Sequence, residues 1–393
     1  MKDGPTSSQL PAMGFIIAGD ETYGVSRFIS SLIDYWISNG TSCSVFSLVE
    51  GPLAQRCRDA GASVEISDLG PPPNYGTRGV AALAAFMRLS AYSAIASLRI
   101  SRWLSRAQVA RIIVRTPNLV PMSAVASRVH SVPAIWVLPN DVSDRYPLGL
   151  NKKLYDILFK VTGLRPVANS AYTKGTLANR LVEADVVHLG VDSKFFDSDA
   201  ICDLDRQSLG LRSEDIVFGL FARVTPDKGQ LEVVEALSLL RSSSRVKILI
   251  VGGPVDGEFG RGLKARASEL GVCDRVVFAG PATDVRPYYK LCDVVLNARR
   301  SPEPFGLSVI EAMMMQKPVL AHKAGGPSET VVDGRTGWLV HEATAESFAA
   351  GFMRALDDRP RWSWMGGQGR ARALAEYDIP VVARRIAAVV VPQ

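Results

Sequence analysis

The chain has 393 residues, of which 47% are hydrophobic and 21% are charged. This composition indicates a globular α/β protein rather than a disordered chain, and the length is enough for two domains of ordinary size. The formal net charge of +6 is modest. No recognisable nucleic-acid-binding motif accompanies it, so we expect no nucleic-acid partner.

The cysteines are odd in number and scattered, and no two form a C-x-x-C pair; they are Cys43, Cys57, Cys202, Cys273 and Cys292. We expect buried thiols in a reducing compartment rather than a disulfide framework or a zinc site. Residues 1–12 lack the apolar core of a signal peptide and are predicted to be a disordered lead-in. The most apolar long stretch, residues 80–100, is interrupted by Arg88 and Arg99, so no membrane span is predicted. These features predict a cytoplasmic protein.

The N-terminal half alternates between strand and helix patterns. A short apolar strand at residues 15–18 leads into a glycine-containing turn at residues 19–24 and a helix at residues 25–38. Such a unit opens a Rossmann-like domain. Further strands are predicted at residues 43–48, 63–66, 111–114 and 134–138 and near Val167 and Val187, with a proline-rich break at Pro71, Pro72 and Pro73. The alternation predicts a first domain over residues 13–192 with a parallel sheet covered on both faces.

The second half repeats this organisation. Residues 193–213 lose the periodicity and are predicted to be the linker between domains, and we interpret Asp203 and Asp205 within them as solvated acids rather than a metal site. A second Rossmann-like domain is predicted over residues 214–370, with strands at residues 216–221, 247–251, 276–279, 294–297, 319–322 and 338–340. Residues 371–393 are predicted to form a C-terminal helical segment.

Two glutamates at the junction of a loop and a helix carry most of the chemistry. Glu303 lies in a proline-flanked loop, and Glu311 lies in the apolar segment 309–315. The start of a helix leaves backbone N–H groups unpaired and favours an anion, which predicts a phosphate seat over residues 306–308. Carboxylates accept hydrogen bonds from hydroxyls instead. A ligand with hydroxyls on both sides of a phosphate, such as a nucleotide sugar, fits this pattern.

The motif EPFGLSVIE, followed by EAM, KPV and GGPSE, resembles the donor-site signature of the retaining glycosyltransferases of family 4. The segments FARVTPDKG and VVDGRTGWLV resemble that family's flanking pieces, and the whole covers most of residues 186–340. The resemblance implies an α/β GT-B fold, in which two doubly wound Rossmann-like domains face a central cleft and the C-terminal helix crosses back to the first domain. It also implies a transfer that retains anomeric configuration, uses a nucleotide-sugar donor, most simply a UDP-sugar, and needs no metal or other cofactor.

The resemblance also implies roles for particular residues. Arg223 and Lys228 match the family's diphosphate contacts and would offset the negative charge that develops on the leaving group. Glu303 would hold hydroxyls of the donor sugar, and Glu311 would hold the ribose. The remaining predicted donor-binding residues lie at strand ends or around the glutamate motif; they are Gly252, Gly253, Phe305, Gly306, Leu307 and Ser308.

On the acceptor side the match to the family is looser. The first loop supplies Gly19, Tyr23 and Gly24 where the family commonly has two glycines. The family also commonly has a histidine where this chain has Pro139, and Asn140 or Asp141 could supply the missing hydrogen bond. The acceptor is expected to be a hydroxyl compound of unknown identity.

The predicted acceptor domain contains an acid-free stretch between Leu69 and Asn140 with eight arginines, namely Arg78, Arg88, Arg99, Arg102, Arg106, Arg111, Arg115 and Arg128. Arginine binds phosphate oxygens in pairs. The candidate partners are therefore an anionic membrane surface, which would place the protein at the inner membrane face, or a phosphorylated acceptor. The alternative is a basic, solvated helix face.

Three other functions were weighed. A phosphorylase or synthase of the same fold would use a small sugar phosphate. A non-catalytic protein that binds nucleotide sugar is suggested by Pro139. A nicotinamide-dependent oxidoreductase is disfavoured because no complete G-x-G-x-x-G follows the first strand.

Overall fold

The computed structural model describes residues 10–21, 24–71, 80–143, 151–177, 183–240 and 245–391. The chain forms two compact units, one of residues 1–190 with 379–393 and the other of residues 191–378. Most of the predicted lead-in lies outside the described residues, as do Tyr23, Arg78 and the last two prolines of the predicted break.

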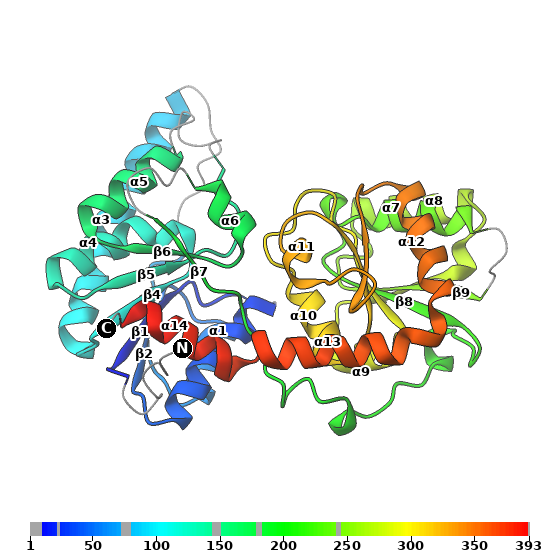
Figure 1. Cartoon of the computed structure of the whole chain (residues 1–393). Helices are drawn as coiled ribbons and strands as arrows, with labels where there is room; N and C mark the ends of the chain where they lie inside the picture. Colours follow the sequence, from blue (N-terminus) through cyan, green and yellow to red (C-terminus); the bar gives the residue numbers. More distant parts are fainter. Residues whose placement is uncertain are drawn as a thin grey trace. The chain divides into compact units, whose positions relative to one another are not determined.

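The first unit is built on a sheet of parallel strands in the order β3-β2-β1-β4-β5-β6-β7 (Figure 1). The strands are β1 (Met13–Ile17), β2 (Cys43–Ser47), β3 (Ser63–Ile66), β4 (Arg111–Val114), β5 (Ala134–Val137), β6 (Arg165–Ala168) and β7 (Asp185–Val186). The chain runs outward from β1 in one direction through β2 and β3, then returns to continue from β4. The carboxyl ends of β1 and β4 therefore form the switch point at which doubly wound sheets bind ligands.

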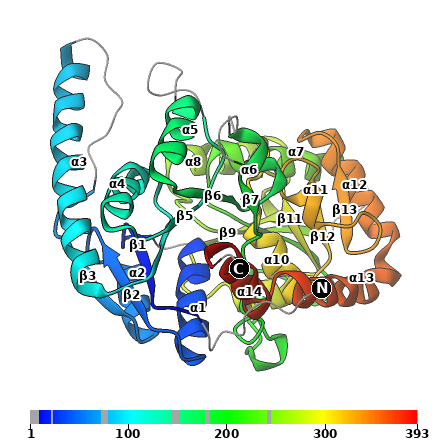
Figure 2. The ribbon, with the colours of Figure 1, turned by 60° about the vertical axis from the view of Figure 1, so that its left-hand side comes forward.

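Helices cover both faces of this sheet because the strands alternate their side chains between them. Phe15 packs on Trp36 of α1 with ring centroids 5.8 Å apart, whereas Phe46 of β2 packs on Trp103 of α3, also at 5.8 Å. Figure 2 shows α3 as the long cyan helix beside α4. The helices are α1 (Gly24–Ser38), α2 (Pro52–Asp59), α3 (Val80–Ala107), α4 (Val120–His130), α5 (Asn151–Thr162), α6 (Ala171–Thr176) and α14 (Ile379–Val390).

The second unit repeats the architecture with a parallel sheet in the order β10-β9-β8-β11-β12-β13. Its strands are β8 (Ile216–Phe221), β9 (Val246–Val251), β10 (Val276–Gly280), β11 (Val294–Asn297), β12 (Val319–His322) and β13 (Gly337–Val340). The helices are α7 (Gln230–Leu239), α8 (Glu258–Glu269), α9 (Arg286–Leu291), α10 (Leu307–Met314), α11 (Pro327–Thr330), α12 (Ala345–Asp357) and α13 (Trp362–Glu376). The switch point lies between β8 and β11.

The prediction of a linker over residues 193–213 is wrong, because this segment belongs to the second unit. Phe196 and Leu211 are buried, and the guanidinium of Arg206 donates to the carbonyls of Leu291 and Asp215. A few buried apolar side chains thus fasten a polar segment that carries no local periodicity. At the other end, the chain changes units between Asp378 and Ile379, so the predicted terminal segment is shared between α13 in the second unit and α14 in the first.

Three further observations bear on the sequence predictions. The two parallel sheets with helices on both faces confirm the predicted GT-B fold class of two doubly wound α/β units. Over the described ranges, no helix is long and apolar enough to cross a membrane. The prediction that all five cysteines are buried is wrong for Cys202 and Cys273, which are exposed in irregular segments.

Candidate functional site

The predicted donor-side residues gather at the carboxyl edge of the second sheet. Arg223 and Lys228 follow β8, Gly252 and Gly253 follow β9, and the loop that carries Glu303 follows β11. In parallel sheets these strand ends share one edge, and β8 and β11 flank the switch point. The structure therefore brings together residues as far apart in the chain as Lys228 and Glu303, which are separated by 75 positions.

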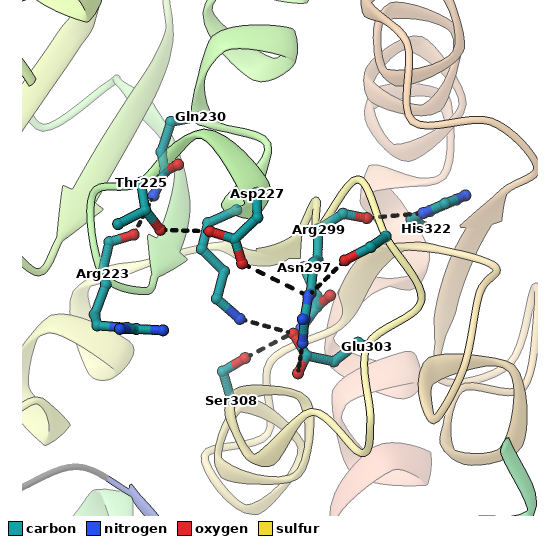
Figure 3. A network of polar contacts seen from close by, with 11 residues as sticks. Arg223, Thr225, Asp227, Gln230, Asn297, Arg299, Glu303, Ser308 and His322 are labelled. Carbon is teal, nitrogen blue, oxygen red and sulfur yellow. Dashed lines mark hydrogen bonds and ion pairs between the residues drawn. The ribbon is translucent and has the colours of Figure 1, made fainter. Parts of the chain in front are cut away.

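Glu303 is held between two cations (Figure 3). Its Oε2 lies 3.2 Å from the ammonium of Lys228, and its Oε1 lies 3.1 Å from the guanidinium of Arg299. The side chains of Glu303 and Lys228 are 15% and 18% exposed, so this ion pair is mostly shielded from water. Arg299 was not among the predicted site residues.

Asp227 adds a second carboxylate to the cluster. It accepts a hydrogen bond from the hydroxyl of Thr225 at 2.7 Å and lies 3.8 Å from Arg299. Burial raises the pKa of Asp227, but the hydrogen bond from Thr225 and the charges of Lys228 and Arg299 outweigh that effect and bring the pKa below its usual value. Asp227 is therefore ionised at neutral pH.

Arg223 differs from the other cations of the site, because its exposed guanidinium makes no ion pair or hydrogen bond with the described residues. The backbone at Arg223 is nevertheless fixed, since its carbonyl accepts a 2.7 Å hydrogen bond from the side-chain amide of Gln230 (Figure 3). Gln230 is fully buried at the start of α7. A cation on an anchored strand end is available for an anionic ligand.

Two glycines let the loops of the site approach each other. Gly229 has φ +75°, and a Cβ there would stand 1.8 Å from the carbonyl oxygen of Ala298. Gly325 has φ +76°, and a Cβ there would stand 2.1 Å from the carbonyl oxygen of Glu303. Only glycine combines this backbone conformation with so close a contact. The loop that holds Glu303 is therefore fixed against its neighbours by backbone packing.

Gly306 and Leu307 start helix α10, with Gly306 at its N-cap and at φ +91°. Phe305 is buried, and Ser308 accepts a 3.4 Å hydrogen bond from the side-chain amide of Asn297. The predicted arrangement of Glu303 in a loop and Glu311 in a helix is confirmed. The first N–H groups of α10 lie beside the ion-paired cluster, as a phosphate seat requires.

Glu311 is buried with 6% of its surface exposed and lies within α10. The hydroxyl of Tyr289 donates to its Oε2 at 2.8 Å, and the ring of Tyr289 stacks on Phe221 with centroids 3.7 Å apart. Tyr289 therefore sets the orientation of Glu311. Tyr289 was not predicted as a partner of Glu311, because it lies 22 residues away in the chain, on another helix.

The remaining donor-side glycines shape the end of β9. Gly252 has φ +144°, and a Cβ there would stand 1.9 Å from the carbonyl oxygen of Ala222. Gly253 accepts a hydrogen bond at its carbonyl from the N–H of Val224. These contacts hold the segment that contains Arg223 against the end of β9.

The predicted acceptor-side residues lie in the first unit. Gly19 follows β1 with φ +104°, and Gly24 is the first residue of α1. Glu21, which was not predicted, accepts hydrogen bonds from the N–H of Gly19 at 2.8 Å and from Arg115 at 3.4 Å. Arg115 thus stabilises the turn after β1 through Glu21, and its side chain is only 12% exposed.

Asn140 and Asp141 line a cavity of about 200 Å³ together with Pro139, Trp136 and Tyr155. The rings of Trp136 and Tyr155 stack with centroids 4.8 Å apart. The indole nitrogen of Trp136 is buried without a hydrogen-bond partner. The segment that replaces the expected histidine therefore borders a compartment large enough for a small ring.

Among the residues that the structure describes, no group of three or more His, Cys, Asp or Glu side chains could hold a metal ion. The two acidic residues of the segment 193–213 make contacts with other protein groups instead. Asp203 lies 2.9 Å from the ammonium of Lys290, and Asp205 accepts a hydrogen bond from the N–H of Gln207 at 2.9 Å.

Comparison with known proteins matches residues 203–372 to the family described as glycosyl transferases group 1. The chain is 31% identical over 223 residues to the lipopolysaccharide core biosynthesis mannosyltransferase LpsB of Rhizobium meliloti, which covers 55% of this chain and 63% of that protein. It is 32% identical over 238 residues to the GDP-mannose-dependent alpha-(1-6)-phosphatidylinositol monomannoside mannosyltransferase of Mycolicibacterium smegmatis, which covers 55% of this chain and 61% of that protein. The matches thus span less than two thirds of these relatives.

Among solved structures, Anabaena HepE in complex with UDP and glucose is similar over 97% of this chain and 99% of its own, with a TM-score of 0.78 and 21% identity. The matched family segment contains the whole cluster of Arg223, Lys228, Glu303 and Glu311. The chain is therefore similar to the group 1 glycosyltransferases over residues 203–372, which are less than half of its length.

Proposed function

We propose that this protein is a retaining glycosyltransferase that moves a sugar from a nucleotide sugar to a hydroxyl acceptor. The observation that carries the proposal is the cluster at the switch point of the second sheet. Glu303 lies there between Lys228 and Arg299, and the exposed guanidinium of Arg223, at the end of the neighbouring strand β8, has no partner among the described residues. The match of residues 203–372 to the group 1 glycosyltransferases supports it.

The proposed chemistry depends on charge. When the bond between sugar and diphosphate breaks, negative charge grows on the leaving phosphate. Each cation about 4 Å away contributes an attraction of roughly 4 kcal/mol at an effective dielectric near 20, part of which desolvation offsets. We assign this role to Arg223 and Lys228, in place of a metal ion. Glu303 orients donor hydroxyls and is not assigned to nucleophilic attack.

The rest of the donor is assigned to α10 and its neighbours. The N–H groups at the start of α10, from Leu307 and Ser308, are proposed to bind the distal phosphate. Glu311 is proposed to accept the ribose hydroxyls, with its carboxylate oriented by Tyr289. Gly252 and Gly253 would allow close approach of the donor to the backbone after β9.

Uracil is the proposed base because of the sequence resemblance, and guanine is the alternative because the Mycolicibacterium relative is named as GDP-mannose-dependent. On the acceptor side, we propose that the turn with Gly19 and Gly24 and the cavity beside Asn140 and Asp141 receive the hydroxyl compound. Tyr23, also predicted there, lies outside the described residues.

A cytoplasmic location with attachment to an anionic membrane surface is part of the proposal. Arg88 and Arg102 are exposed on α3, next to the exposed apolar side chains of Met87 and Leu98, whereas Arg106 forms a 2.6 Å ion pair with Glu65. Other arginines of the acid-free stretch are used within the unit, since Arg111 donates to the carbonyl of Val390 and Arg115 to Glu21. The basic surface is therefore smaller than the sequence predicted. A phosphorylated acceptor is the alternative ligand for it.

The experiment that tests the proposed function is calorimetric titration with UDP-, GDP- and ADP-sugars, with and without EDTA, followed by measurement of slow nucleotide release. Binding of one donor that EDTA does not weaken, together with slow hydrolysis, is the expected result. Binding without hydrolysis or transfer would favour a non-catalytic nucleotide-sugar-binding protein. A response only to free phosphate or a small sugar phosphate would favour a phosphorylase or synthase.

A further inference from the structure

Both oxygens of the Glu303 carboxylate are already engaged by cations. Lys228 lies 3.2 Å from Oε2 and Arg299 lies 3.1 Å from Oε1. Neither oxygen can take a short hydrogen bond from a sugar hydroxyl at the same position as a cation. Lys228 directs its ammonium at Glu303, so a phosphate competes with this carboxylate for the position of the ammonium and for its N–H donors. A ligand that uses either group therefore competes with this ion pair.

The two cations are not held equally well. Arg299 has further restraints, because its Nε donates to the hydroxyl of Ser301 at 3.1 Å and its carbonyl lies 2.8 Å from the Nδ1 of His322 (Figure 3). Its Nε also lies 3.8 Å from Asp227. The ammonium of Lys228 has a hydrogen bond only to Glu303 among the described residues. The ammonium of Lys228 is carried by a flexible four-carbon side chain. The guanidinium of Arg299 is planar and rigid, which suits contact with a fixed carboxylate.

We propose that the Lys228–Glu303 ion pair is a resting contact that the donor's diphosphate displaces, and that Arg299 is the positioning residue that keeps Glu303 in place during the exchange. This inference rests on the proposed function. Lys228 passes to the phosphate, beside Arg223. Glu303 keeps its contact with Arg299 through Oε1, and Oε2 becomes free to accept a hydrogen bond from the donor sugar.

The exchange links binding of the donor's diphosphate to binding of its sugar. Binding of the diphosphate draws the cation away from Oε2, which leaves that oxygen open to the sugar hydroxyl. The charges stay matched, since the carboxylate retains one cation and the diphosphate gains another. Breaking the resting pair costs free energy, which lowers the affinity for a nucleoside diphosphate that lacks the sugar.

The test is a double-mutant cycle with free UDP and GDP as probes, measured by calorimetry on the full chain. The variants are Glu303→Gln, Lys228→Met and the combination of both. Glu303→Gln is nearly isosteric and frees Lys228, so it is expected to bind the nucleotide about three to ten times more tightly than the wild type, as loss of a partly shielded ion pair implies. Its turnover is expected to fall, because the sugar loses its carboxylate.

The cycle separates exchange from simple repulsion. In the Lys228→Met background, Glu303→Gln is expected to leave nucleotide affinity unchanged, because no ammonium remains to be freed. Equal tightening in both backgrounds would mean that the carboxylate merely repels the diphosphate, and the inference would be overturned. If Glu303→Gln binds the nucleotide no more tightly than the wild type does, the exchange inference is also overturned. The proposed donor site would still stand in that case, because the wild type binds the nucleotide. If the wild type binds neither nucleotide, the proposed function itself fails.

Arg299 is tested with Arg299→Met and Arg299→Lys. We expect Arg299→Met to lower kcat and raise KM for the donor, and Arg299→Lys to restore most of both, because a lysine can keep one contact to Glu303. The matched control is Arg335→Met, which removes an arginine that contacts only Gln368 among the described side chains and is expected to change neither constant. Wild-type kinetics in Arg299→Met would refute the positioning role.

Discussion

Gly229 offers the sharpest test of how the donor site is built. It joins Lys228 to helix α7, has φ +75°, and its missing Cβ would stand 1.8 Å from the carbonyl oxygen of Ala298, which directly precedes Arg299. Gly210 has a similar φ of +67°, but no atom lies within 4 Å of its missing Cβ. The two glycines belong to the same unit and differ mainly in this contact.

The expected cost of each Gly→Ala change follows from that difference. An alanine in the left-handed region costs about 1–2 kcal/mol, and reduced freedom of the unfolded chain returns about 0.4–1 kcal/mol, so Gly210→Ala should destabilise the protein by about 1 kcal/mol. Gly229→Ala must also push two backbones apart, which adds about 1–3 kcal/mol. We therefore expect a total of about 2–4 kcal/mol, or two to four times the cost of the control.

Thermal unfolding followed by circular dichroism measures the loss, since about 1 kcal/mol lowers Tm by roughly 2–4 °C in a unit of this size. Calorimetry with UDP and GDP then measures the effect on binding. Gly229→Ala should also weaken nucleotide binding, because the clash moves Lys228 away from the loop of Arg299 and Glu303, whereas Gly210→Ala should not. Equal Tm shifts for the two variants would contradict the close-approach argument. Unchanged nucleotide affinity in Gly229→Ala would show that the site tolerates the displacement.

Three other changes test separate parts of the site. Arg223→Ala should weaken nucleoside diphosphate binding by about 1.5–3 kcal/mol, the range for a hydrogen bond to a charged group, and calorimetry that shows no change would remove it from the site. Tyr289→Phe keeps the stacked ring but removes the hydroxyl that donates a hydrogen bond to Glu311. We therefore expect KM for the nucleotide sugar to rise with little change in Tm. An unchanged KM would argue against a ribose contact at Glu311. Replacement of both Arg88 and Arg102 by Gln should reduce co-sedimentation with anionic liposomes, and wild-type binding should fall with added salt; salt-independent binding would refute the electrostatic attachment.

Local sequence patterns predicted much of the framework. The alternation of apolar strands and helices is a property of short stretches, and it predicted both sheets and the placement of Glu303 in a loop and Glu311 in a helix. Parallel sheets also place every strand's carboxyl end at one edge, so the predicted donor residues could be expected to meet there. The individual roles of those residues remain proposals.

Tertiary contacts decided the features that have no local signal. Arg299 reads in the sequence as one of two adjacent loop arginines, and only the fold of that loop brings its guanidinium to Glu303. Residues 193–213 read as a linker because their periodicity is lost, yet Phe196 and Leu211 bury them in the second unit. Arg111 reads as part of a basic surface, but it donates to the carbonyl of Val390 in α14.

The division has a physical reason. Secondary structure and strand-end loops depend on periodicity and on residues such as Gly229, whose conformational preference is local. The partners of a side chain depend on which segments pack together after the chain has folded, and neither Tyr289 nor Glu311 carries information about the other in its own neighbourhood. The sequence by itself therefore determined the two doubly wound units and the position of the donor motif, whereas the tertiary structure alone decided which cations hold Glu303 and which hydroxyl orients Glu311.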